Sequence, residues 1–312
     1  MSLAPGPELL VHSSSSESDE RLARARGELV RLVPGRYVRA QHWRVFDDRE
    51  RYLMLSFAAL SALRCDAVLS HASAAAFWGL PRLGAWPSRA QVTVPAATTS
   101  TANRWAYKHA SRLSDDETLE FAGFRVTSPA RTGVDLALVS SFRQSVVALD
   151  HGLHVGLFDQ NELLDLSSDR SAVRGVVRAK RAIEFADARA DRPGESLSRV
   201  VIHEGGFEEP DLQKHFPNPT GPDAYGDFWW RGCRRVGEFD GEVKYRDARM
   251  RSGRSPEQVV IDEKNRENWL ARQPGVNGVV RWDWRTVVTP GALARLLLEA
   301  GVPQVRSRVS RV

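Results

Sequence analysis

The chain contains 312 residues, of which 42% are apolar and 27% are charged, and this length and balance suit about two globular domains with buried cores. Two cysteines exclude a disulfide framework and a four-thiolate zinc site, so we expect any metal ion to be bound by oxygen. The net charge is +5 with only five lysines among 44 basic residues, which favours nucleic acid as a partner because the planar arginine fork suits phosphate.

The composition changes at three points along the chain. A serine run at residues 13–16 indicates a disordered leader over residues 1–19, and the Pro- and Gly-containing stretch at residues 190–194 is the best candidate for a domain boundary. We therefore expect a first domain at residues 20–190, a second at residues 191–303 and a basic tail at residues 304–312.

The apolar stretch at residues 53–63 is too short for a membrane span, which needs about 20 apolar residues. A charged and then apolar leader is also missing from the start of the chain. We expect a cytoplasmic, soluble protein with no membrane partner.

In the first domain, the Pro34–Gly35 turn between two short apolar runs predicts a hairpin. Ser70 and Ser128 stand at N-cap positions, and Gly79 is placed to end a helix. Alternating runs between residues 91 and 127 predict a small sheet. The remaining patterns predict helices at residues 19–26, 47–64, 70–79, 142–155, 159–166 and 171–189.

In the second domain, the expected order is helix, three strands, helix, strand and helix. This order predicts a mixed sheet with helices on its faces, so the fold class is α/β, with an α+β first domain. The expected elements are helices at residues 195–204, 255–273 and 290–300 and strands near residues 212–213, 225–230, 234–245 and 279–284.

Acidic side chains alternate along the strand expected at residues 234–245. Glu238, Asp240, Glu242 and Lys244 share one face because side chains of a strand alternate, and Asp227 lies on the strand paired with it. One interpretation is a solvated edge strand in which Lys244 neutralises its neighbours. The other is a site for Mg²⁺ or Mn²⁺, since like charges on one face repel unless a cation lies between them.

These residues resemble the PD-(D/E)XK nuclease core. The stretch from Gly194 to Trp282 is similar to the very-short-patch-repair-like endonuclease domains of uncharacterised actinobacterial proteins. The resemblance implies metal binding by Asp227, Glu238 and Asp240. It places Glu195 and Gln213 in the same cleft, and Lys264 and Arg266 are candidates for contacting DNA phosphate.

Two registers stay open for the acidic pair. In the first register, Glu238 is the acidic residue and Asp240 stands at the third motif position. In the second register, Glu242 and Lys244 take these two places. The more closely similar endonuclease domains favour the first register.

The first domain has its own resemblance, to the type IV antitoxins of abortive infection (AbiEi-like). The segments that carry it are residues 26–38, 68–75, 79–81 and 127–132. It implies a winged helix at residues 20–40 that binds DNA, and a cognate toxin or regulatory protein is a possible partner. A complete winged helix needs two helices before its recognition helix, and the segment at residues 5–11 is the single candidate before the serine run, so the winged helix is expected to be partial. Four arginines are candidate phosphate contacts, namely Arg24, Arg26, Arg31 and Arg36.

Two functions follow as hypotheses. The first is a Mg²⁺-dependent DNA endonuclease joined to an antitoxin-like domain. The alternative is a DNA-binding transcriptional regulator or antitoxin that keeps the nuclease fold without catalysis. His71 is expected to be a core or capping histidine in either case.

Overall fold

The computed structural model describes residues 5–12, 22–190, 192–219, 223–241, 269–270 and 272–305. The chain divides into two compact units, a first unit at Met1–Ala186 and a second unit at Asp187–Val312. Four residues proposed for the nuclease or for DNA contact, Glu242, Lys244, Lys264 and Arg266, lie outside the described residues, as do most of the expected helix at 255–273 and most of the leader and tail. In the described part of the chain, none of the helices has the length and apolarity to cross a membrane.

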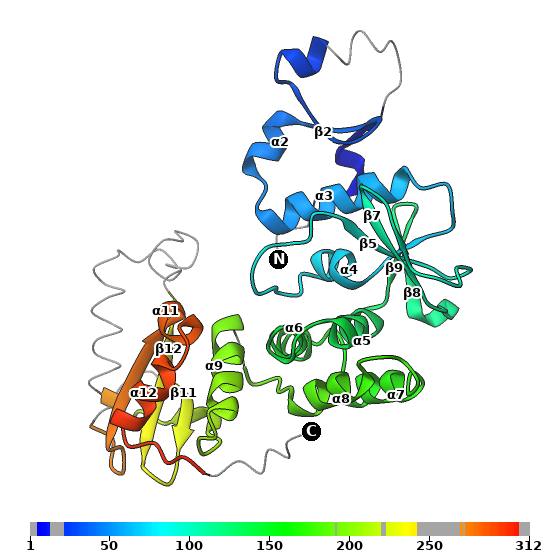
Figure 1. Ribbon diagram of the computed structural model, residues 1–312. Coiled ribbons are helices and arrows are strands. Elements are labelled where there is room, and N and C mark those ends of the chain that lie inside the picture. The colour runs from blue at the N-terminus through cyan, green and yellow to red at the C-terminus, as the bar shows by residue number, and fades with distance from the viewer. Residues whose placement is uncertain are drawn as a thin grey trace. The chain divides into compact units, whose positions relative to one another are not determined.

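The first unit opens with a small antiparallel sheet of order β1-β3-β2, next to the helical residues 22–25 (Figure 1). Its strands are β1 (Leu10–His12), after the 3₁₀ turn η1 (Pro7–Leu9), β2 (Leu29–Val33) and β3 (Arg36–Arg39). Gly35 takes a φ of +70° in the turn, a left-handed conformation that glycine adopts without strain. The predicted hairpin is therefore confirmed.

Two helices follow the hairpin and are joined by a short segment. The short α2 (Ala40–Val45) leads to α3 (Asp48–Ser61), which begins with a capping box between Asp47 and Glu50. Met54 and Phe57 of α3 are buried in the core of this unit.

A mixed six-stranded sheet of order β6-β7-β5-β4-β9-β8 forms the centre of the first unit. Helix α4 (His71–Trp78) follows β4 and ends at Gly79, whose φ is +76°. The strands are β4 (Val68–Leu69), β5 (Ala90–Val94), β6 (Thr101–Ala102), β7 (Ala106–Ala110), β8 (Thr118–Phe121), preceded by η2 (Asp115–Glu117), and β9 (Phe124–Thr127).

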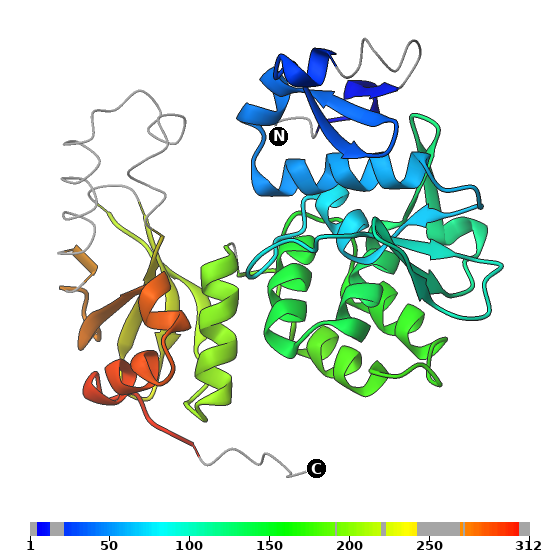
Figure 2. The same cartoon turned by 45° about the horizontal axis from the view of Figure 1, so that its top comes forward.

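Four helices complete the first unit and pack against one another (Figure 2). Side chains of Ser128, Ser141 and Asp159 cap the first three. The fourth begins later than residue 171 because Gly175 holds a left-handed conformation at its N-cap. The helices are α5 (Pro129–Val139), α6 (Phe142–His154), α7 (Gln160–Ser168) and α8 (Val176–Phe185).

The second unit is a four-stranded sheet of order β10-β11-β12-β13 with helices against it. The first three strands are antiparallel and β13 runs parallel to β12, so the sheet is mixed and the α/β class is confirmed. The elements are α9 (Pro193–Glu204), β10 (Asp211–Phe216), β11 (Ala224–Trp230), β12 (Arg235–Asp240), β13 (Gly278–Asp283), α11 (Trp284–Val288) and α12 (Ala292–Glu299).

The two faces of this sheet bury different clusters. On the face covered by α9, α11 and α12, Phe228 packs against Trp282, and the Trp282 indole N–H donates to Ser198 Oγ of α9 at 2.8 Å. Trp230 joins them, so these tryptophans are core residues, as expected. The cluster on the opposite face comprises Phe216, Ala224, Val236 and Leu270.

Candidate functional site

An interruption of strand β10 brings Gln213 to Glu195. Leu212 pairs with Phe228 on the α9 face, whereas Phe216 faces the opposite way, although residues four apart share a face in a regular strand. The alternation breaks at Gln213, whose φ of +51° is uncommon for a residue with a side chain. Its amide nitrogen donates to Glu195 Oε2 at 3.1 Å, so the structure joins two of the predicted cleft residues.

Asp227 on β11 lies against the neighbouring strand β12. Its Oδ2 accepts a hydrogen bond of 2.8 Å from the backbone N–H of Phe239. Phe239 stands between Glu238 and Asp240 in the sequence, so the Asp227 carboxylate lies beside the acidic segment of β12. The antiparallel pairing of β11 and β12, expected from the sequence, produces this juxtaposition.

Glu238 is paired with an arginine. The parallel register of β12 and β13 places Arg281 directly opposite Glu238, and Arg281 Nη2 donates to Glu238 Oε2 at 2.5 Å. Glu238 is buried, whereas Asp240, at the end of β12, is half-buried, and its carboxylate forms no hydrogen bond or ion pair with another described residue. The two acids thus have different surroundings although both lie on the same strand.

Within the described ranges, no three His, Cys, Asp or Glu side chains come together in a group that could hold a metal ion. Asp227, Glu238 and Asp240, which were expected to bind a metal together, therefore do not form such a group. The strand register places Glu238 opposite Arg281, and these two residues form an ion pair. Asp227 and Asp240 are the other two carboxylates of this set, and two carboxylates completed by water are a ligand set that Mg²⁺ accepts in proteins.

The four arginines expected to contact DNA differ in orientation. Arg24, Arg26 and Arg31 are exposed, whereas the Arg36 guanidinium turns back to Ser61 and donates to its Oγ at 2.8 Å and its carbonyl at 3.0 Å. Arg36 therefore fastens the hairpin to α3 instead of pointing outward.

A groove of about 670 Å³ lies beside the hairpin. Three exposed arginines line it, namely Arg26, Arg39 and Arg44, with Glu28 as the acidic residue among them. Arg39 and Arg44 were not among the four candidate phosphate contacts.

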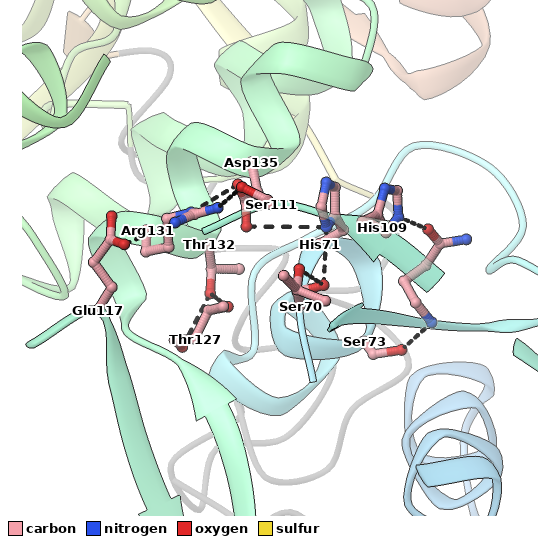
Figure 3. Close-up of polar contacts among 12 residues, drawn as sticks. Ser70, His71, Ser73, His109, Ser111, Glu117, Thr127, Arg131, Thr132 and Asp135 are labelled. Atoms are coloured by element: carbon pink, nitrogen blue, oxygen red, sulfur yellow. Dashed lines mark hydrogen bonds and ion pairs between the residues drawn. The ribbon is translucent and has the colours of Figure 1, made fainter. Parts of the chain in front are cut away.

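A buried network of charges in the first unit also went unrecognised in the sequence (Figure 3). The Arg131 side chain is 1% exposed, and it donates to Asp135 Oδ1 at 2.8 Å and to Glu117 Oε2 at 2.9 Å. Arg170 forms a second ion pair with Glu117. The detectable signal was Arg131 and Asp135 four residues apart on a largely apolar helix, a spacing that places both on one face.

The pKa values of the two carboxyl groups in this network are shifted in opposite directions. Burial raises the pKa of Glu117, but the Ser114 backbone N–H, Arg131 and Arg170 outweigh burial and leave that pKa below its ordinary value. Burial raises the pKa of Asp135 above its ordinary value against the pull of Arg131, and Asp135 Oδ2 has no hydrogen-bond partner in the described part of the chain.

His71 lies next to this network and its backbone is strained. Its φ is +49° at the first position of α4, its Nδ1 is 2.9 Å from Ser70 Oγ, and its ring stacks on His109 with centroids 3.6 Å apart. Burial first, and the Arg131 charge second, lower the pKa of His71 to about 3, so the ring is neutral at pH 7. It is a buried histidine as expected, in an environment more polar than the sequence indicated.

The comparisons with known proteins name no activity. No protein-family model matches the chain. The uncharacterised proteins MT2308 and Rv2248 of Mycobacterium tuberculosis are 29% identical to it over 119 residues, which is 38% of this chain and 44% of theirs, so the chain spans less than half the length of these relatives. The crystal structure of the RV2827C protein from Mycobacterium tuberculosis has a TM-score of 0.35 and 17% identity, covering 65% of this chain and 77% of that one, and we draw nothing from it.

Proposed function

We propose that the second unit is a metal-dependent endonuclease that hydrolyses phosphodiester bonds in DNA. The observation that carries the proposal is the bond between the Asp227 carboxylate and the Phe239 N–H, which brings an acid from β11 beside Glu238 and Asp240 on β12. The order of a helix, three antiparallel strands and a fourth strand parallel to the third supports the resemblance to PD-(D/E)XK nucleases.

In this proposal, Asp227 and Asp240 hold Mg²⁺ or Mn²⁺, which when bound would offset phosphodiester charge and lower the pKa of a water molecule. Arg281 fixes the orientation of Glu238 beside them. Gln213 holds Glu195 in place through its amide. Glu242 and Lys244 stay candidates for the second register, and Lys264 and Arg266 for phosphate contacts.

The test is cleavage of supercoiled plasmid, linear duplex and single-stranded DNA by the purified full-length chain. We expect cleavage with Mg²⁺ or Mn²⁺ that EDTA abolishes, and a loss of at least about 100-fold in Asp240→Asn, since even residues that only support a metal ligand contribute 10- to 100-fold. Asp211→Asn is the matched control, because Asp211 lies on the same sheet and pairs with the exposed Arg231. An inactive wild type, or an Asp240→Asn variant as active as Asp211→Asn, would contradict the proposal.

A second candidate function, DNA binding by the first unit as in a regulator or antitoxin, is favoured by the arginine-lined groove. Each arginine that neutralises a phosphate releases counterions, so its removal should lower the slope of log Kd against log salt by about 1. We expect that change for Arg39→Gln and Arg44→Gln in a duplex DNA titration. Arg36→Gln should leave the slope unchanged, because Arg36 is bound to Ser61. Equal slopes in all three variants would count against this function.

A further inference from the structure

A cavity of about 410 Å³ lies within the first unit, in the range of small-molecule sites. It is bounded by residues of α4, β5, α5, α6 and the segment after α4. Apolar side chains such as Leu136 and Pro87 form part of its wall. Its polar lining consists of His71, Arg82, Gln91, Ser140, Ser141 and Gln144, and no aspartate or glutamate lines it among the described residues.

Arg82 supplies a positive charge to this cavity. Its Nε donates to the Ala85 carbonyl at 2.8 Å, which fixes the guanidinium plane. The two terminal nitrogens form no hydrogen bond or ion pair with any residue that the structure describes. They are therefore two parallel donors held at the cavity wall, the arrangement that binds a phosphate or carboxylate bidentately.

His71 supplies a donor on a buried side chain. Ser70 Oγ accepts a hydrogen bond from Thr93 Oγ1 at 2.9 Å and lies 2.9 Å from His71 Nδ1, and in the tautomer that we assign the Ser70 hydroxyl donates to this nitrogen. We assign the remaining ring proton to Nε2, which has no partner in the described ranges and is directed away from Ser70 (Figure 3). The residue is 6% exposed and lines the cavity, so this N–H is a donor available at the cavity wall.

The other polar lining residues add fixed geometry without negative charge. Ser141 is the N-cap of α6, whose 13 residues direct the positive end of the helix dipole toward this wall. Both polar atoms of the Gln144 amide are hydrogen-bonded. Its Oε1 accepts from Leu83 N at 2.6 Å, and its Nε2 donates to the Pro81 carbonyl at 3.1 Å. These two bonds fasten the segment that carries Arg82 to α6, so the donors are held in place before any ligand binds.

We propose that this cavity binds a small organic phosphate of about mononucleotide size, with Arg82 and His71 Nε2 as the donors to its phosphate group. The cavity volume admits such a molecule, its charge is positive, and its apolar wall suits the uncharged part of the ligand. The φ of +49° at His71 is the strain expected of a residue positioned for binding. This site is independent of the proposed nuclease in the second unit.

Isothermal titration of the full-length chain with AMP, inorganic phosphate and adenosine tests the proposal. We expect saturable binding of AMP, with adenosine at least tenfold weaker because it lacks the phosphate. Inorganic phosphate binding as tightly as AMP would identify the phosphate group as the sole recognised part, and phosphate weaker than AMP would show that the apolar wall contributes. No saturable binding of either phosphate compound at millimolar concentration would overturn the proposal.

Two variants assign the donors. Arg82→Gln removes the charge, and His71→Asn removes the ring with a residue that tolerates positive φ. Each should weaken AMP binding at least tenfold. Arg89→Gln is the control, since Arg89 is an exposed arginine of the same loop that does not line the cavity. AMP binding that is unchanged in both Arg82→Gln and His71→Asn, with wild-type circular dichroism, would overturn the assignment.

Discussion

Replacing Arg131 with glutamine should destabilise the first unit strongly. The side chain is 1% exposed and holds Asp135 and Glu117, whose side chains are 3% and 8% exposed. Removing one partner of a buried ion pair costs about 3–5 kcal/mol, because the other charge stays buried without compensation. Arg170 still pairs with Glu117 in the variant, so the uncompensated charge is that of Asp135 and we expect a loss of about 3 kcal/mol.

The assay is urea unfolding of the full-length chain followed by circular dichroism, with the free energy taken from the transition of the first unit. The matched control is Arg125→Gln, which breaks the exposed pair with Asp66 and should cost less than about 1 kcal/mol. Protonating Asp135 removes the buried charge, so the deficit of Arg131→Gln should shrink as the pH falls from 7 toward 5. A loss no larger than that of Arg125→Gln, independent of pH, would refute the assignment of Arg131 as the centre of the network.

Two further predictions concern stability. Burial lowers the pKa values of His71 and His109 to about 3 in the folded chain, whereas histidine in the unfolded chain has a pKa of about 6.5. Below about pH 6.5 the unfolded chain therefore binds protons that the folded chain does not, and the stability of the first unit should fall. In a plot of the urea midpoint against pH, the decrease below about pH 6.5 should be smaller for His71→Asn than for the wild type. An equal decrease would refute the prediction. Gly237→Ala places a Cβ 2.6 Å from the Trp282 ring and should cost about 1–3 kcal/mol. Gly241→Ala should cost little, because the nearest atom of the described residues is 3.8 Å away. Equal thermal midpoints for the two glycine variants would contradict this.

Local patterns were sufficient to place most helices and strands. The Ser128 cap, the Gly79 termination and the Pro34–Gly35 turn each act within a few residues of sequence, and the structure has the corresponding elements where they were expected. Ser70 stands at the N-cap position of α4 as expected, but its side chain forms no capping hydrogen bond. Elements without such a local pattern were not predicted from the sequence. Helix α11 is only five residues long, which is too short for a periodic pattern, and its Asp283 cap lies inside a strand pattern.

The candidate sites depended more on distant partners. Alternation along β12 identified Glu238 and Asp240 as acids of one face, but the parallel register with β13 decided that Glu238 meets Arg281, 43 residues away. In the first unit, β5 and β7 align so that His109 bonds to Gln91 and stacks on His71.

The sequence by itself therefore determined the α/β class, most element positions and the acidic strand, because capping and side-chain alternation depend on neighbouring residues. Only the tertiary structure decided which charges are neutralised and which donors face a cavity. Those outcomes depend on strand register and helix packing, which bring residues together across long stretches of chain. The ion pair that commits Glu238, the carboxylates that surround Arg131 and the cavity beside His71 all arise in that way.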